Sequence, residues 1–165
     1  MFESWAKHAL PRLTLLLALA LPGWAAIAAP SESVSAPTAS APEDADYAAG
    51  KRAVEAKNWR AALDAFNKVV ATDPGNANAH NFLGYAYRNS GQLDLAFKHY
   101  EEALRLDPKH RGAHEYLGEA YLMVNNLAKA EEHLKVLDRL CLFGCEEYDD
   151  LKKAVAEFRQ KAASK

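Results

Sequence analysis

Two cysteines, Cys141 and Cys145, are the residues of this chain best suited to redox or metal chemistry. Three residues separate them, so the spacing is neither the C-x-x-C of thiol oxidoreductases nor the C-x-x-C-H of haem attachment. A metal site would need further sulfur or imidazole ligands nearby, and none is adjacent in the sequence. The spacing favours a structural disulfide across a turn near Phe143-Gly144. Free thiols, or a redox or metal-handling role, are the alternatives.

Histidine is the second residue type with potential chemistry. His80 and His114 lie 34 residues apart, and so do His99 and His133. Recurrence at a fixed spacing indicates packing or a solvated face rather than a set of metal ligands. His110 and His114 could share a metal at i, i+4, but His110 precedes its predicted helix. We therefore predict no metal site and no cofactor.

Motifs for catalysis are missing from the sequence. It has no Ser/His/Asp set, no glycine-rich phosphate loop and no paired-carboxylate geometry. The formal net charge of −2 argues against nucleic acid as a partner, because phosphate binding needs a clustered basic surface. We predict a protein that is not an enzyme and does not bind nucleic acid.

The elements that position these side chains follow from an internal repeat. In the second period of this repeat, Ser90-Gly91-Gln92 separates two stretches of helical periodicity, and Asp107-Pro108 ends the second stretch. Each period is therefore predicted to be a pair of helices. Three columns keep one residue type at a spacing of 34 residues: Gly50/Gly84/Gly118, Ala62/Ala96/Ala130 and Ala45/Ala79/Ala113.

The small-residue columns predict close contacts between helices. We expect Gly84 and Ala96 to be buried where the two helices of the second pair meet. One pair cannot bury both of its faces, so successive pairs must stack. The predicted fold is all-α: a right-handed α-solenoid of three helix pairs plus a C-terminal capping helix over residues 146–162. The apolar stripe of that capping helix consists of Tyr148, Leu151, Val155 and Phe158.

The second period resembles the tetratricopeptide repeat. The residues that carry the resemblance are Leu83-Gly84, Tyr87, Gly91, Ala96, Tyr100, Ala103 and Pro108. The third period matches at Leu117-Gly118, Tyr121, Ala130 and Leu137, and the first at Gly50, Ala62, Phe66, Val69 and Pro74. In the third period Leu142 takes the place of the closing proline. The resemblance implies repeats at 43–76, 77–110 and 111–144, followed by a capping helix and tail at 145–165.

The resemblance also implies a binding surface. Proteins of this family generally bind extended peptides or helices with the first helix of each pair. The family's clamp for C-terminal acidic motifs is not reproduced, since Tyr47 and Asn81 stand where clamp residues would be sought. The mapped partner-binding positions are Tyr47, Lys51, Asn78, Asn81, Phe82, Tyr85, Arg88, Asn89, Glu115, Tyr116, Glu119 and Met123.

The first residues have the features of an export signal. Lys7 and Arg12 precede the apolar run 13–21, and small residues follow. The sequence Ala26-Ile27-Ala28 predicts cleavage after Ala28, and the run is far shorter than the ~20 residues of a membrane span. We therefore predict a signal peptide over 1–28, a disordered Ala/Pro/Ser linker over 29–42, and no stable membrane insertion after cleavage.

These features predict a periplasmic or secreted protein–protein interaction module, a scaffold or assembly factor whose partner is another protein or peptide. A homodimer formed through the same face is an alternative use of the surface. The alternative function is that of an envelope redox or metal-handling accessory using Cys141 and Cys145.

Overall fold

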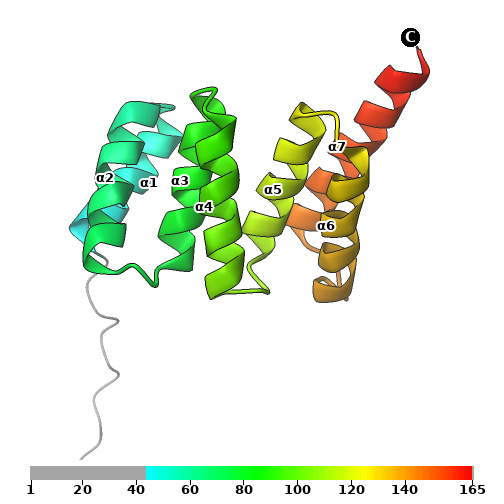
Figure 1. Ribbon diagram of the computed structural model, residues 1–165. Coiled ribbons are helices and arrows are strands. Elements are labelled where there is room, and N and C mark those ends of the chain that lie inside the picture. The colour runs from blue at the N-terminus through cyan, green and yellow to red at the C-terminus, as the bar shows by residue number, and fades with distance from the viewer. Residues whose placement is uncertain (1–43, 165) are drawn as a thin grey trace, which may run out of the picture. The chain divides into compact units, whose positions relative to one another are not determined.

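A computed structural model of the protein describes residues 44–164. Over these residues the chain forms seven α-helices and no strand (Figure 1). The predicted signal peptide and linker lie outside the described residues. The helices are α1 (Ala45–Glu55), α2 (Trp59–Thr72), α3 (Ala77–Asn89), α4 (Leu93–Leu106), α5 (Arg111–Met123), α6 (Leu127–Leu140) and α7 (Glu146–Ala163).

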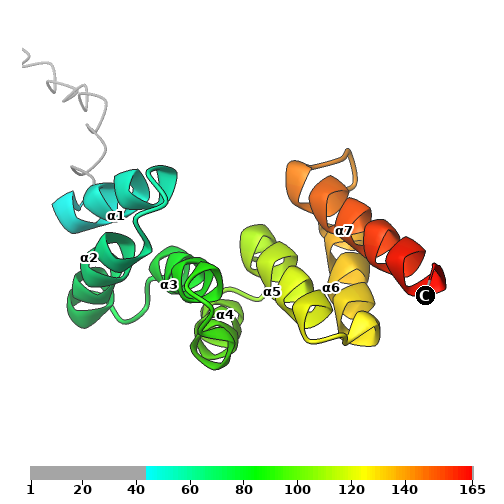
Figure 2. The same cartoon turned by 90° about the horizontal axis from the view of Figure 1, so that it is seen from above.

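The helices form two layers within the unit Ala39–Lys165. Helices α1, α3, α5 and α7 make one layer, and α2, α4 and α6 make the other (Figure 2). Each first helix packs against the helix that follows it, and α2 and α4 also pack against the first helix of the next pair. Helix α7 packs against both α5 and α6. None of the described helices is long and apolar enough to cross a membrane.

The turn inside each pair has a recurring conformation. Lys57, Gly91 and Asn125 are 34 residues apart, and their φ angles are 54°, 79° and 59°. Glycine adopts this left-handed conformation freely, whereas a residue with a Cβ pays about 1–2 kcal/mol. The turn therefore keeps its shape in the first and third pairs, although its glycine is missing there.

Side-chain caps define where most of the helices begin. The side-chain oxygens of Asn58, Asn76 and Asn126 accept hydrogen bonds from backbone N–H groups three residues further on, at 3.2, 3.0 and 3.2 Å. His110 caps α5 in the same way, because its Nδ1 accepts from the Ala113 N–H at 3.0 Å. Such a cap stabilises a helix by ~1 kcal/mol. The repeat thus keeps the cap even where histidine replaces asparagine.

Large side chains fill the spaces above the repeated glycines. A Cβ placed on Gly50 would lie 2.6 Å from the Phe66 ring, and one on Gly84 would lie 2.6 Å from the Tyr100 ring. Ala96 has no exposed surface. The predicted burial of Gly84 and Ala96 is confirmed.

In the third pair, the side chain that covers the repeated glycine comes from a different helix. A Cβ on Gly118 would meet a methyl group of Leu151 on α7 at 2.6 Å. Leu134, in the column of Phe66 and Tyr100, is only partly buried. Leucine is shorter than phenylalanine or tyrosine, and α7 supplies the side chain that covers Gly118. The last helix is therefore part of the core of the third pair, and Leu151 and Val155 are buried there.

Candidate functional site

The open side of the layer α1, α3, α5 and α7 is termed the inner face. At its centre Tyr85 on α3 and Tyr116 on α5 have ring centroids 4.8 Å apart. The guanidinium carbon of Arg88 lies 5.3 Å from the centroid of each ring. Arg88 also forms an ion pair with Glu119 of α5, and only 12% of its side chain is exposed. These contacts join the second and third pairs, so Arg88 and Glu119 stabilise the stack as well as lining the surface.

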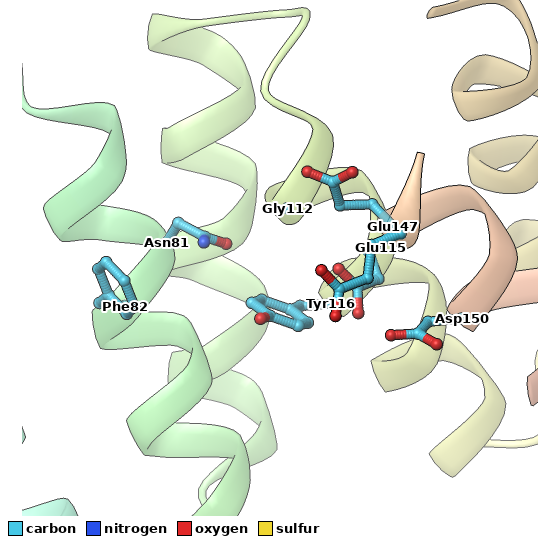
Figure 3. Close-up of a pocket in the computed structure, with 8 residues that line it drawn as sticks. Asn81, Phe82, Gly112, Glu115, Tyr116, Glu147 and Asp150 are labelled. Atoms are coloured by element: carbon cyan, nitrogen blue, oxygen red, sulfur yellow. The ribbon is translucent and has the colours of Figure 1, made fainter. Parts of the chain in front are cut away.

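An acidic pocket of about 230 Å³ lies beside this cluster, between α3, α5 and α7 (Figure 3). Its polar side chains come mainly from the start of α5 and the start of α7. The Asn81 amide points from α3 toward α5 (Figure 3). The residues that line the acidic pocket are Asn81, Phe82, Gly112, Glu115, Tyr116, Glu146, Glu147 and Asp150.

The electrostatic field in the acidic pocket is dominated by carboxylates. Glu115 is 8% exposed. Burial raises the pKa of Glu115 to about 8, with further contributions from the negative charges of Glu119, Asp150 and Glu147. Arg111 partly offsets this field, since its Nε lies 3.5 Å from a carboxylate oxygen of Glu147. The pocket therefore has a strong excess of negative charge when Glu115 is ionised.

A second, more apolar pocket lies further along α5 and α7, and it also includes Arg88 of α3. It encloses about 350 Å³. On α5 its residues Glu119, Leu122 and Met123 lie seven positions after those of the acidic pocket, a shift of ~10 Å along the helix axis. The residues that line the apolar pocket are Arg88, Glu119, Leu122, Met123, Ala154, Glu157, Phe158 and Lys161.

Seven of the twelve predicted partner-binding residues line these two pockets. They are Asn81, Phe82, Glu115 and Tyr116 in the acidic pocket, and Arg88, Glu119 and Met123 in the apolar pocket. Tyr85 belongs to the aromatic cluster between them. With 54% of its surface exposed, Met123 is the most accessible apolar side chain in this set.

The remaining predicted residues have contacts within the chain. The Tyr47 ring lies 5.5 Å from Phe66 and 5.9 Å from Phe82, and Lys51 Nζ lies 6.0 Å from the Tyr47 ring. Asn89 Nδ2 donates to the Tyr85 carbonyl at 2.8 Å. Asn78 Oδ1 accepts from His110 Nε2 at 2.9 Å. The structure thus brings the predicted residues of α3 and α5 together, whereas Tyr47 of α1 packs against Phe66 of α2 and Phe82 of α3.

Sequence reasoning missed the contribution of α7 to the inner face. The sequence predicts this helix only as a cap with an apolar stripe, yet Glu146, Glu147 and Asp150 line the acidic pocket. The signal that indicates this role is spacing. Helix α7 begins 35 residues after α5, so it occupies the place of a first helix in a further pair. A first helix in that place adds its side chains to the inner face.

The cysteines lie at the corner between α6 and α7, next to the first turn of α7, and neither of them lines either pocket. Their Sγ atoms are 2.03 Å apart and their Cα atoms 5.6 Å apart. The Sγ atoms also lie within 4.8 Å of a carboxylate oxygen of Glu147, a spacing that thiolates could use to hold a metal. Sulfurs bonded to one another supply no thiolate, so a disulfide at this spacing and a metal site would exclude each other.

The histidine columns form two equivalent ring pairs, one between α3 and α4 and the other between α5 and α6. His80 Nδ1 and His99 Nδ1 are 3.1 Å apart, and His114 Nδ1 and His133 Nδ1 are 2.9 Å apart. His80 Nε2 donates to the Pro74 carbonyl, as His114 Nε2 does to the Pro108 carbonyl. Both ring nitrogens of His80 and of His114 are therefore used within the chain. Of the two roles that the repeat spacing predicts, packing and a solvated face, this is packing.

Two family models match the sequence over most of the described helices. One model of the tetratricopeptide repeat matches residues 47–110, and a second matches residues 88–140. The chain belongs to the tetratricopeptide repeat (TPR) family. The predicted family and the predicted all-α TPR solenoid are confirmed.

Solved structures share the TPR fold of this chain. The Sgt2 TPR domain from Aspergillus fumigatus is similar with a TM-score of 0.66 and 25% identity, covering 74% of this chain and 81% of that one. The TPR2B domain of yeast Sti1, in a complex with pHsp70, has a TM-score of 0.65 and 17% identity, covering 70% and 94%.

A third similar structure is that of a TPR with a bound peptide. The first TPR of Spaghetti (RPAP3), bound to the HSP90 peptide SRMEEVD, has a TM-score of 0.61 and 18% identity, covering 69% of this chain and 90% of that one. No curated protein matches the sequence of this TPR chain significantly. TPR folds of this kind are protein–protein interaction modules, so a protein or peptide is the class of partner to which the fold is suited.

Proposed function

We propose that this TPR protein is an exported interaction module that binds an extended peptide or a helix of another protein along its inner face. The observation that carries the proposal is the pair of neighbouring pockets between α3, α5 and α7. They lie ~10 Å apart along α5, a distance that about three residues of extended chain span. One peptide could therefore place a side chain in each pocket.

The chemistry of the two pockets supports binding rather than catalysis. Neither pocket is lined by serine, cysteine or histidine among the described residues. The aromatic cluster next to them supplies rigid, amphipathic contact area of the kind that dominates binding energies. A scaffold or assembly factor needs this recognition surface and no catalytic group.

Export would determine the compartment in which this protein meets its partner. The predicted signal peptide places the mature protein in the periplasm or outside the cell, and the Cys141–Cys145 disulfide suits an oxidising compartment. We propose that the bond fixes the corner at which α7 turns back against α5 and α6. This corner lacks the proline that closes the first two repeats, so the bond would hold in place the helix that completes both pockets.

The proposal is tested by substituting Met123, which lines the apolar pocket and is well exposed. Random 12-residue peptides displayed on phage are selected against the wild-type chain, and their affinities are measured by fluorescence anisotropy. Met123→Asp should lower the affinity at least tenfold, because truncating a central contact costs ~2 kcal/mol or more. The melting temperature should stay unchanged, since no core contact is removed.

The matched control is Val124→Asp, the neighbouring exposed residue, which lines neither pocket. It should leave peptide affinity unchanged. Equal loss in both variants, or selected peptides that bind Met123→Asp as tightly as wild type, would contradict binding on the inner face. Arg88 is a poorer test site, because its removal also breaks the contact between α3 and α5.

A further inference from the structure

The polar groups in the wall of the acidic pocket are dominated by hydrogen-bond acceptors. Four of the lining residues are carboxylates: Glu115, Glu146, Glu147 and Asp150. No lysine, arginine or histidine is among the residues that line it. A ligand that supplies several N–H donors and a positive charge would complement this wall, whereas an anionic ligand would be repelled.

Asn81 supplies a second and independent observation. Its side chain is directed toward the pocket, and only 5% of the residue is exposed. Its Oδ1 has no hydrogen-bond partner among the described residues. A buried, unpaired amide oxygen costs about 1–3 kcal/mol relative to a bonded one. Gly112 keeps the room for this amide, since a Cβ there would lie 3.3 Å from Asn81 Nδ2.

The size and the remaining walls of the pocket suit a side chain. Its volume of about 230 Å³ corresponds to roughly eight waters and lies below the ~300–1,000 Å³ of small-molecule sites. Phe82 and Tyr116 form its aromatic wall. Aromatic rings accept both the methylene stem and the charged head of a basic side chain.

We propose that the acidic pocket binds the cationic side chain of a lysine or arginine in the peptide partner. The ammonium or guanidinium group donates to the carboxylates of Glu115, Glu147 and Asp150 and to Oδ1 of Asn81. This inference rests on the proposed function, to which it adds the chemistry of the partner: a basic residue about three positions from a large apolar residue that enters the apolar pocket.

The other occupants fit the pocket less well. A bare metal ion needs ligand atoms that converge, and the described residues contain one such group, Cys141, Cys145 and Glu147, which does not include Glu115 or Asp150. The acidic peptide SRMEEVD, named in the RPAP3 structure, would bring further carboxylates into a wall of carboxylates. An organic cation of side-chain size satisfies both the charge and the volume.

Protons compete with the proposed cation. The pKa of Glu115 is raised to about 8 by burial and by the charges that face it, namely Glu119 on its own helix and Asp150 and Glu147 on α7, against the opposing charge of Arg88 on α3. At pH 7 Glu115 therefore retains its proton in most molecules of the free protein. Affinity for the cation should rise severalfold between pH 7 and pH 9, where lysine and arginine remain charged.

The first experiment uses small probes on the exported chain. Nα-acetyl-lysine-N-methylamide, its arginine analogue and its neutral norleucine analogue are each titrated while amide resonances are followed by NMR. The lysine and arginine probes should shift the Asn81, Glu115 and Tyr116 resonances in a saturable way, and the norleucine probe should not. The relative affinities of the two cationic probes distinguish lysine from arginine.

Two outcomes overturn the inference at this stage. One is the absence of saturable shifts with either cationic probe, or equal shifts with norleucine. The other is displacement of the cationic probes by calcium chloride at micromolar concentration, which would make the pocket a metal site.

The second experiment uses matched carboxylate variants. At pH 9, where Glu115 is mostly ionised, Asp150→Asn and Glu115→Gln should each weaken binding of the cationic probe about fivefold or more. Asp149→Asn is the control, because Asp149 lies on the same turn of α7 but does not line the pocket. Its affinity should equal that of wild type. Glu115→Gln should not unfold the protein, since it removes a carboxylate that burial and like charges already disfavour.

The selected peptides separate failure of this inference from failure of the proposed function. Replacement of their basic residue by norleucine should reduce affinity at least as much as Asp150→Asn does. Peptides that lose affinity with Met123→Asp but are insensitive to both of these changes would overturn the inference and leave the function standing. Cationic probes that bind the pocket, together with peptides insensitive to Met123→Asp, would overturn the function instead.

Discussion

At the scale of single residues, a missing side chain determines how closely two helices approach. Gly84 on α3 faces the ring of Tyr100 on α4, and both residues are buried. Tyr100 occupies the space that a Cβ on Gly84 would need. The ring of Tyr100 is rigid and lies in a filled core, so it cannot move aside without disturbing Leu117 and Ala120 in the same cluster.

Gly84→Ala is therefore expected to lower the free energy of unfolding by ~1–3 kcal/mol through overpacking, despite the higher helix propensity of alanine. Urea denaturation followed by circular dichroism measures the change. Gly75→Ala is the control. Gly75 is exposed, and a Cβ there would lie 3.5 Å from Asp73 Oδ1, an ordinary contact. Equal stability of Gly84→Ala and wild type would show that the two helices are not in contact at this position.

At the scale of helices, the two histidine pairs connect neighbouring elements. His80 on α3 contacts the turn after α2 through the Pro74 carbonyl and contacts His99 on α4. His114 and His133 repeat the arrangement between α5, α6 and the turn after α4. The rings of Tyr87 and Tyr121 stack on His99 and His133 at 5.3 and 5.7 Å between centroids. A proton added to either pair would place charge in this packed environment.

The two histidine pairs should make the free energy of unfolding depend on pH. Burial, reinforced by the neighbouring histidine, lowers the pKa of His99 and of His133 to about 4. The unfolded chain, with histidine pKa near ~6.5, therefore binds more protons between pH 6.5 and 4. The stabilisation from neutral histidine is complete above pH 6.5 and is lost as the pH falls toward 4.

Between pH 7 and pH 5 we expect a loss of ~1–3 kcal/mol from the two pairs, allowing for partial solvent screening. Glu115, with a pKa raised to about 8, changes stability in the opposite sense, so the comparison must be made between variants. The double variant His99→Phe, His133→Phe should show a flatter dependence in urea titrations at pH 5, 6 and 7. If the free energy of unfolding of the double variant falls as much between pH 7 and pH 5 as that of wild type, groups other than these histidines cause the pH dependence.

At the scale of the whole molecule, export and disulfide formation can be read from one measurement. We expect the intact mass of the protein recovered after secretion to correspond to a chain that begins at Ala29. The mass should be lower than that of the reduced chain by two hydrogen atoms, because Cys141 and Cys145 are bonded. Cys141→Ser cannot form the bond and is the control for the two missing hydrogens. Because the disulfide closes so short a loop, its loss should lower the free energy of unfolding by only ~2 kcal/mol. Retention of Met1, or two titratable thiols per chain, would contradict the prediction.

Most of the fold follows from periodic, local information. The 34-residue columns of glycine and alanine predict helix pairs and their close contacts, and Gly84 and Ala96 are buried as expected. The positions of Asn81, Phe82, Glu115 and Tyr116 on first helices predict a shared face, and these four residues line one pocket. Such predictions succeed because a repeat places equivalent residues in equivalent surroundings, so that the spacing alone carries the geometry.

The sequence by itself determined the TPR pairs, their turns and the identity of the first helices. Only the tertiary structure decided that α7 completes the site. Leu151 fills the space above Gly118, and this packing brings Glu147 and Asp150 to the pocket of Glu115. It also decided that Arg88 pairs with Glu119. These contacts join residues that lie about thirty positions apart on different helices, and they depend on side-chain size and burial at each junction, which a repeat pattern does not specify.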